Sequence, residues 1–432
     1  MIYKDLIGEI KKTNRHTIIH GLAGSGKSTF IRDFSNDVKE RCLKIAPTGL
    51  SAFNIDGITI ESFIALLKKN KKSLLRYLLG NIDYIIIDEI SMVHYYKLDD
   101  IFSINQKLER SNGYIKLIIV GDPFQLPPVV TRNMKNVYYK KTGIELLEAD
   151  FYFFNSKQFN HYLISDKFQL YYLNANLRQA DNAFSSALAK IAMGTADQKC
   201  FEYFNKREYF NTTEIEKKTL PLITTTKKMT DFFNSKGLSH CELFRDHMPI
   251  IEKIYEGYSE VSKENKHLLE PFRYAANIPI VFIQNDPEKK WRNGTRGMIK
   301  SIFCSPEAVD ILLESDELVK CFPTQHKVQR LVYNEKTKEV KSECVAIIRR
   351  FPFILGFALT VHRCQGMTLE KLTFNVGHGC FASGQLYVAL SRVRNINDLT
   401  LETALIAEDM KTEDNVKEYF ERFLMKSTII SE

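Results

Sequence analysis

Short apolar runs alternate along the chain with segments whose apolar residues recur every three or four positions. The runs near 16–20, 43–46, 84–87 and 115–121 are continuous rather than alternating, which is typical of strands that a parallel sheet buries on both faces. The segment after the first run has the helical spacing of an amphipathic helix, with apolar residues at 30, 31, 34 and 38. The pattern therefore predicts an α/β protein built on parallel strands.

The region 277–349 has a different pattern. Its short β-rich runs are separated by turn residues, which favours a small antiparallel barrel over another strand–helix–strand layer. The single tryptophan, Trp291, precedes one of these turns. It could stack on a nucleic-acid base or belong to the core.

The first apolar run leads into a glycine-rich loop, GLAGSGKS at 21–28. Glycine lets the backbone turn sharply and approach an anion, so that successive N–H groups and the start of the next helix face a phosphate. Lys27 adds a positive charge for the β- and γ-phosphates, and the Ser28 hydroxyl is a ligand for Mg²⁺. The predicted nucleotide-binding residues of this loop are Gly21, Ala23, Gly24, Ser25, Gly26, Lys27, Ser28 and Thr29.

Two other apolar runs end in polar residues at the edge where parallel α/β sheets bind ligands. Asp88 and Glu89 follow the run at 84–87. Asp88 is predicted to hold Mg²⁺, and Glu89 to orient or deprotonate the attacking water. Gln125 lies after the run at 115–121 on a proline-stiffened turn, where its amide can sense a γ-phosphate. These residues predict hydrolysis of a nucleoside triphosphate.

Composition narrows the class of protein. The 432 residues give room for about three domains. The net charge of +8 permits a polyanionic partner without requiring one. Eight scattered cysteines without a paired spacing predict reduced thiols in an intracellular protein, of nuclear, cytoplasmic or viral origin, and no metal–cysteine site. Because signal-peptide and membrane-spanning patterns are absent, we expect a soluble protein with no membrane partner.

The order of the motifs adds a resemblance. GLAGSGKS (21–28), APTG (46–49), IIIDEISM (85–92) and GDPFQLPPV (121–129) follow one another as they do in superfamily 1 helicases. The chain is similar to the PIF-type DNA helicases of the 5′-to-3′ branch, over nearly its whole length. The resemblance implies two RecA-like lobes with parallel sheets and an SH3-like β-barrel inserted in the second lobe. The implied boundaries are 1–174 for the first lobe, with a small insertion near 64–82, then 175–276 and 350–432 for the second lobe, and 277–349 for the barrel.

The resemblance also implies roles for single residues. Arg178 would reach the γ-phosphate from the second lobe, Gly366 in TVHRCQG (360–366) would lie close to it, and Arg392 in GQLYVALSR (384–392) would act as an arginine finger when the lobes close. Glu61 stands where the family has histidine, and the first fifteen residues contain no glutamine of the kind that reads adenine. The implied DNA-binding residues are Pro47, Thr48, Thr59, Ser62, Phe63, Thr225, Thr226, Lys227, Thr360 and His362.

The expected function is that of an ATP- and Mg²⁺-dependent DNA helicase that moves 5′ to 3′ on single-stranded DNA and acts at duplex junctions. We expect a monomer, with room for an unidentified single-strand-binding or replication partner. Two alternatives stay open at this point. One is a superfamily 1 RNA helicase, because contacts to phosphates and base faces do not exclude a 2′-hydroxyl. The other is a nucleotide-gated single-strand binder that does not unwind duplex.

Overall fold

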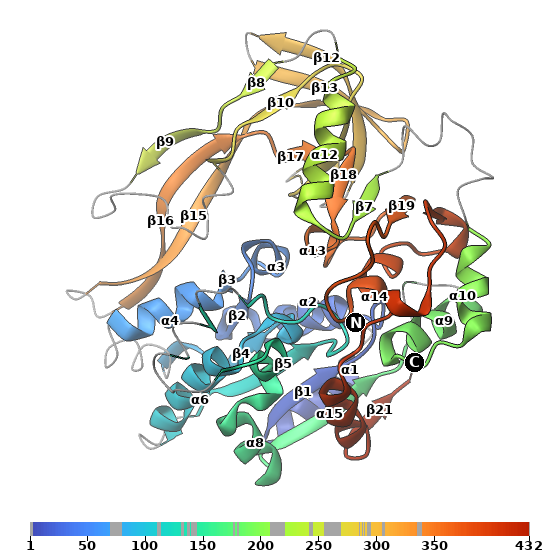
Figure 1. The fold of residues 1–432 in the computed structure, drawn as a ribbon. Helices are drawn as coiled ribbons and strands as arrows, with labels where there is room; N and C mark the ends of the chain where they lie inside the picture. Colours follow the sequence, from blue (N-terminus) through green and yellow to red (C-terminus); the bar gives the residue numbers. More distant parts are fainter. Residues whose placement is uncertain are drawn as a thin grey trace.

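The computed structural model shows two α/β lobes and a β-rich region above them (Figure 1). No described helix is long and apolar enough to cross a membrane. The structure describes residues 3–69, 80–109, 114–130, 134–135, 139, 145–175, 178, 181–207, 221–241, 245–254, 269–284, 286, 288, 290–291, 295–304, 307–334 and 339–431. The predicted insertion near 64–82 lies largely outside these residues.

The first lobe is built on a seven-stranded sheet in the order β21-β6-β1-β5-β4-β2-β3, in which every pairing is parallel. Its strands are β1 (His16–His20), β2 (Cys42–Ala46), β3 (Ile58–Thr59), β4 (Tyr84–Ile87), β5 (Lys116–Gly121), β6 (Phe168–Leu173) and β21 (Thr428–Ile430). Successive residues of the central strands belong to different core clusters. Ile18 packs on one side of the sheet and Ile19 on the other. Both faces are therefore buried, as the continuous apolar runs predict.

Helices cover both faces of this sheet. One face carries α1 (Lys4–Lys12), α2 (Lys27–Val38) and α3 (Gly49–Asn54). The other carries α4 (Ile60–Lys69), α6 (Tyr95–Glu109), α8 (Lys157–Ile164) and α15 (Asp414–Leu424). Because every strand is parallel, the loops that leave the carboxyl ends of β1, β4 and β5 meet at one edge of the sheet. This edge holds the residues predicted to bind nucleotide.

The second lobe contains a smaller parallel sheet in the order β18-β7-β19-β20. The strands are β7 (Leu222–Thr224), β18 (Ala358–Thr360), β19 (Leu372–Asn375) and β20 (Leu399–Leu401). The helices of this lobe are α9 (Asn182–Met193), α10 (Gln198–Asn205), α12 (Lys227–Leu238), α13 (Val361–Cys364) and α14 (Gln385–Leu390). Two α/β lobes with parallel sheets were expected, and both are present.

The inserted β region is antiparallel, as its short runs predict, but it is wider than 277–349. It starts at β8 (Arg245–His247) and ends at β17 (Phe353–Leu355), because β17 pairs with a strand inside 277–349 and His247 of β8 bonds to Glu307. The described strands form sheets of five, three and two strands, and a closed barrel stays a prediction. The other strands are β9 (Ile250–Ile254), β10 (Phe272–Tyr274), β11 (Pro279–Phe282), β12 (Arg296–Cys304), β13 (Glu307–Leu313), β14 (Leu318–Cys321), β15 (Thr324–Asn334) and β16 (Glu339–Arg350).

Two features of this region bear on the site. The β15–β16 hairpin reaches across to the first lobe, where β15 contacts α4 (Figure 1). Trp291 is only 7% exposed and stacks on Phe282 with ring centroids 4.4 Å apart. The core alternative for Trp291 is therefore confirmed, and the ring is not presented to a base.

The end of the chain corrects one predicted boundary. Residues 350–432 were assigned to the second lobe, but β21 pairs with β6 and α15 packs on first-lobe aromatic residues. The Tyr419 ring, for example, stacks on Phe154 at 4.9 Å. Apolar spacing identifies a helix here, but it does not reveal which sheet buries the apolar face. The chain thus returns to the first lobe after forming the second.

His16, at the start of β1, gives a stability prediction. Its buried ring stacks between Tyr114 and Tyr162, and its Nδ1 accepts a hydrogen bond from the Leu117 N–H at 3.1 Å. Burial lowers the pKa of His16 from 6.5 to about 3. The unfolded chain therefore takes up the proton first as the pH falls. The free energy of unfolding should fall by about 1.4 kcal/mol per pH unit for this residue, starting below about pH 6.5.

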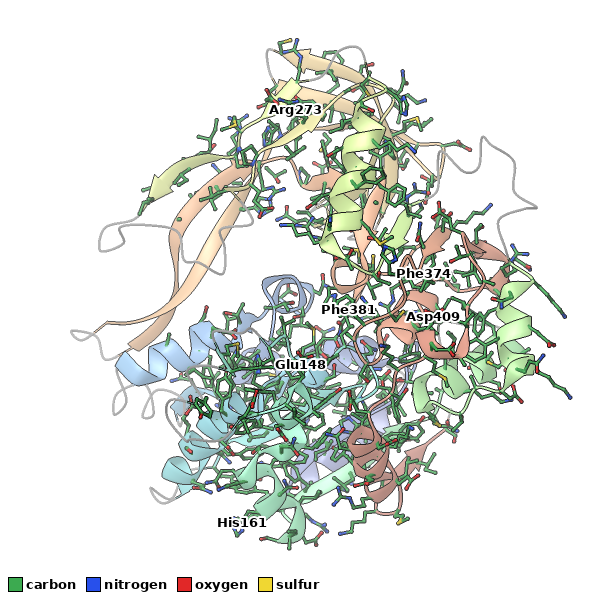
Figure 2. All side chains as sticks on the ribbon, in the orientation of Figure 1. Glu148, His161, Arg273, Phe374, Phe381 and Asp409 are labelled. Carbon is green, nitrogen blue, oxygen red and sulfur yellow. The ribbon has the colours of Figure 1, made fainter. Side chains whose placement is uncertain are left out.

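We expect His16→Gln to have a shallower fall in melting temperature than the parent between about pH 7 and pH 4.5. The matched control is His161→Gln, which changes an exposed histidine on α8 (Figure 2) and should keep the parent's dependence. Equal pH slopes in parent and His16→Gln would contradict the assignment of a neutral, buried His16.

Candidate nucleotide and nucleic-acid site

The loop 21–28 joins β1 to α2 and requires its glycines. Gly24 and Gly26 have φ angles of 90° and 87°, in the region that favours glycine. A Cβ atom on Gly21 would lie 2.3 Å from the Ser25 Oγ and 2.8 Å from the Leu173 carbonyl oxygen. The backbone is therefore folded as a phosphate-binding loop that opens directly into α2.

Lys27 bonds to this loop itself. Its ammonium donates to the carbonyl oxygens of Gly21 at 2.6 Å and Leu22 at 2.8 Å. Burial lowers the pKa of Lys27, while the carboxylates of Asp122, Glu89 and Asp88 act in the opposite direction. The two carbonyl oxygens accept the hydrogen bonds that phosphate oxygens would accept from Lys27 in a nucleotide complex.

The adjacent carboxylates lie directly after β4. Glu89 has a φ of 50°, which is uncommon for a residue other than glycine, so the turn is held in a strained conformation. Burial, and then the nearby Glu89, raise the pKa of Asp88. A buried carboxylate with this neighbour gains from a bound cation. With the Ser28 hydroxyl and phosphate oxygens, the donor set is all oxygen, which suits Mg²⁺.

Gln365 of the second lobe contacts two first-lobe residues that are predicted to act in hydrolysis. The Gln365 Nε2 lies 3.3 Å from the Glu89 Oε2 and 3.3 Å from the Gln125 Oε1. Gln125 in turn donates to the Asp122 carboxylate at 3.3 Å. The Gln365 Oε1 is buried and has no hydrogen-bond partner among the described residues. The two lobes therefore meet at the residues predicted to handle the attacking water.

Both predicted arginines reach this junction. Arg178 donates to the Ser391 carbonyl oxygen at 3.1 Å, and burial, together with Arg392, lowers the pKa of Arg178 to about 9. Arg392 is 1% exposed and donates to the carbonyl oxygens of Val388 at 2.7 Å, Met367 at 3.1 Å and Cys364 at 3.2 Å. Its guanidinium thus holds α14 to the loop after α13, a structural role that the sequence did not predict. The arginine-finger role stays a prediction.

Four of the hydroxyls predicted to bind DNA share one local role. Thr48 accepts from the Ser51 N–H at 3.1 Å and Thr59 from the Ser62 N–H at 3.2 Å. Thr226 and Thr360 cap α12 and α13 in the same way. Helix capping is the commoner use of such residues, and it is confirmed here. Pro47 and Ser62 are partly buried beside these caps, and Lys227 is exposed as the first residue of α12.

Two of the side chains predicted to bind DNA are buried in this structure. Phe63 is fully buried in the core, so its ring cannot stack on a base. Thr225 is 2% exposed, and its hydroxyl donates to the Val376 carbonyl oxygen at 3.2 Å. Apolar periodicity places Phe63 on the inner face of α4. A threonine at the end of a strand can bond to the protein core as readily as to a bound ligand.

The remaining predicted positions have distinct surroundings. Glu61 forms an ion pair with Lys97, which compensates the charge at the position where the family has histidine. His362 is partly buried, and Phe381 lies with its ring within 17° of the His362 plane. Phe381 is 59% exposed and lies where the second lobe faces the first (Figure 2). Gly366 has a φ of 80°, and a Cβ atom on it would lie 3.5 Å from the Nδ2 atom of Asn54 in the first lobe.

Sequence reasoning missed several residues of this junction. It assigned no role to Tyr387, Asp122 or Phe381, and it named Gln365 only as part of a motif. One signal was present: Tyr387 interrupts the apolar face of a short buried helix, and a buried tyrosine hydroxyl needs a hydrogen-bond partner. The partner lies in the other lobe, which the local sequence does not specify.

The Gln365 contacts give a test of the lobe junction. Gln365→Glu would place a second carboxylate beside Glu89, so we expect the DNA-stimulated ATPase rate to fall at least tenfold. Gln365→Leu removes the hydrogen bonds without adding charge, and its loss should be nearer fivefold, which corresponds to about 1 kcal/mol. Steady-state ATPase assays compare the two. Equal losses would contradict a close approach of Gln365 to Glu89.

Comparison with known proteins agrees with this geometry. Residues 1–199 match the family model described as PIF1-like helicase. The chain is 27% identical to the ATP-dependent DNA helicase Pif1 of Campylobacter jejuni over 94% of both chains. It is 28% identical to that of Bdellovibrio bacteriovorus, covering 91% of this chain and 85% of the relative.

A solved structure of Bacteroides sp. Pif1 in complex with ADP-AlF4 has the same fold. It covers 99% of this chain and 98% of its own, with a TM-score of 0.79 and 22% sequence identity. The chain is thus similar to PIF1-like helicases along most of its length, and residues 1–199 match the model of that family.

Proposed function

We propose that this chain moves 5′ to 3′ along single-stranded DNA and separates duplex DNA, using ATP hydrolysed between its two lobes. Relatives named as ATP-dependent DNA helicases, similar over 91–94% of this chain, support this activity. The direction rests on the resemblance to the 5′-to-3′ branch. The observation that carries the mechanism is the contact of Gln365 with both Glu89 and Gln125, because it ties the predicted hydrolytic residues to the second lobe.

Each residue of the first-lobe edge has a role in this proposal. The N–H groups of the loop 21–28 and the Lys27 ammonium hold the phosphates. Ser28 and Asp88 hold Mg²⁺, which neutralises phosphate charge when it is bound. Glu89 orients or deprotonates the attacking water, and Gln125 responds to the γ-phosphate.

The second lobe responds to the nucleotide through its cations. Burial, and then the nearby Arg392, lower the pKa of Arg178, so an anion beside these two cations is favoured. ATP would bind best to the arrangement in which both face its phosphates, and hydrolysis would remove that preference. Repeated binding and hydrolysis would then move one lobe relative to the other.

The proposed DNA path crosses the capped helix starts of both lobes. Thr48 and Thr59 belong to the first lobe, and Thr226 and Thr360 to the second, with Lys227 exposed beside them. Contacts of this kind reach phosphates rather than base edges, so movement would be largely independent of sequence. A solved Bacteroides Pif1 is bound to single-stranded DNA, which supports the same class of partner for this chain.

Glu89→Gln tests the hydrolytic assignment. We expect the ATPase rate to fall by about a hundredfold or more, because the amide cannot accept the proton from water, while equilibrium binding of a non-hydrolysable ATP analogue stays within about twofold. The exposed Glu408 supplies the matched control, since Glu408→Gln should match the parent. A Glu89→Gln variant that hydrolyses ATP like the parent would remove Glu89 from the mechanism.

The direction is tested with partial duplexes that carry a 5′ or a 3′ single-stranded tail. We expect ATP-dependent strand separation only from the 5′ tail, and ATPase stimulation by single-stranded DNA above that by RNA of the same sequence. Separation from the 3′ tail would reverse the proposed polarity. Stimulation by RNA alone would favour an RNA helicase, and ATPase without separation a translocase that does not unwind.

A further inference from the structure

Tyr387 of the second lobe bonds directly to the phosphate-binding loop. Its hydroxyl oxygen accepts a hydrogen bond from the backbone N–H of Ala23 at 2.6 Å and donates its proton to the Asp122 carboxylate at 2.8 Å. The side chain is 1% exposed.

The Ala23 N–H, which donates to the Tyr387 hydroxyl, is also a predicted donor to nucleotide phosphate. The backbone N–H groups of such a loop are the donors that hold nucleotide phosphates. The Ala23 N–H, in the middle of the loop, is already satisfied by the tyrosine oxygen at 2.6 Å. One N–H makes one strong hydrogen bond, so a phosphate oxygen and the Tyr387 hydroxyl compete for it.

Asp122, the other hydrogen-bond partner of Tyr387, also bonds to Gln125, one of the residues predicted to act in hydrolysis. Asp122 is fully buried, and its carboxylate accepts from the Phe124 N–H at 3.1 Å and from Gln125 at 3.3 Å as well as from Tyr387. The backbones also lie close here, because a Cβ atom on Gly384 would lie 2.3 Å from the Phe124 carbonyl oxygen. A shift of α14 would therefore change the position or the hydrogen bonds of Gln125.

We propose that Tyr387 is a positioning residue that competes with nucleotide phosphate for the Ala23 N–H and so couples the occupancy of the loop to the position of α14. While the Tyr387–Ala23 hydrogen bond is formed, the second lobe fills one phosphate donor of the first. When a phosphate takes the Ala23 N–H, the hydroxyl keeps only Asp122, and α14 is released from the loop. This proposal rests on the proposed function and adds the means by which the second lobe senses an occupied site.

Tyr387→Phe isolates the hydroxyl, since it keeps the buried ring. We expect equilibrium binding of ADP and of a non-hydrolysable ATP analogue, measured without DNA, to become roughly fivefold tighter, the change that one hydrogen bond is worth. A purely structural role would leave affinity unchanged or weaken it. Unchanged or weaker binding in a variant with the parent's melting temperature would overturn the proposal.

Tyr419→Phe is the matched control. The Tyr419 hydroxyl is also buried and bonds to His20 at 2.7 Å, at the end of the strand that leads into the loop, but it meets no N–H of the loop. Nucleotide affinity should stay within about twofold of the parent. Equal tightening in both variants would show a general loosening of the site and would overturn the competition.

A second measurement begins with the parent protein and does not depend on the variant alone. We expect hydrogen exchange at the Ala23 amide to be protected in the nucleotide-free state, and that protection to be lost in Tyr387→Phe. An unprotected amide in the parent would overturn the proposal even if the variant did not fold. Neither binding nor exchange requires DNA or hydrolysis, so a parent that binds ADP as expected but fails to unwind DNA would contradict the proposed function and not this competition.

Discussion

The buried carboxylate of Asp122 is the group on which the contact between the lobes depends. It has no exposed surface, and burial raises its pKa while Lys27 opposes that shift. A buried carboxylate is tolerated only when hydrogen-bond donors surround it. Two donors come from its own loop and the third is the Tyr387 hydroxyl of the second lobe. The position of the second lobe relative to the first is therefore fixed by the need to satisfy one buried charge, and not only by apolar contact.

Apolar packing limits how far the lobes can separate. One core cluster runs from the first sheet through α15 and α9 to the strands of the second sheet. Phe420 of α15, for example, packs on Phe124 at the carboxyl end of β5, with ring centroids 4.8 Å apart. Because interiors are closely packed, such a shared core favours small sliding or hinge movements over wide opening. The polar junction then decides which of the closely related arrangements is adopted.

The local parts of this architecture follow from the sequence, and the long-range parts do not. Continuous apolar runs predicted β4 and β5, and the spacing of glycines predicted the loop 21–28, because each depends on neighbours a few residues away. The placement of β21 beside β6, the burial of Phe63 and the carbonyl contacts of Arg392 depend on segments far away in the chain. No local pattern distinguishes a threonine that caps a helix from one that also binds a phosphate.

Several donors of the site are bonded within the protein itself, and this determines what binding must do. Lys27 is bonded to carbonyl oxygens of the loop, the Ala23 N–H to Tyr387, and Arg392 to three carbonyl oxygens of the second lobe. A phosphate that contacts Lys27 or the Ala23 N–H replaces an internal hydrogen bond. Part of its binding free energy is therefore spent on rearranging groups that belong to both lobes. That exchange is the physical link by which occupancy of a loop in the first lobe changes the position of the second.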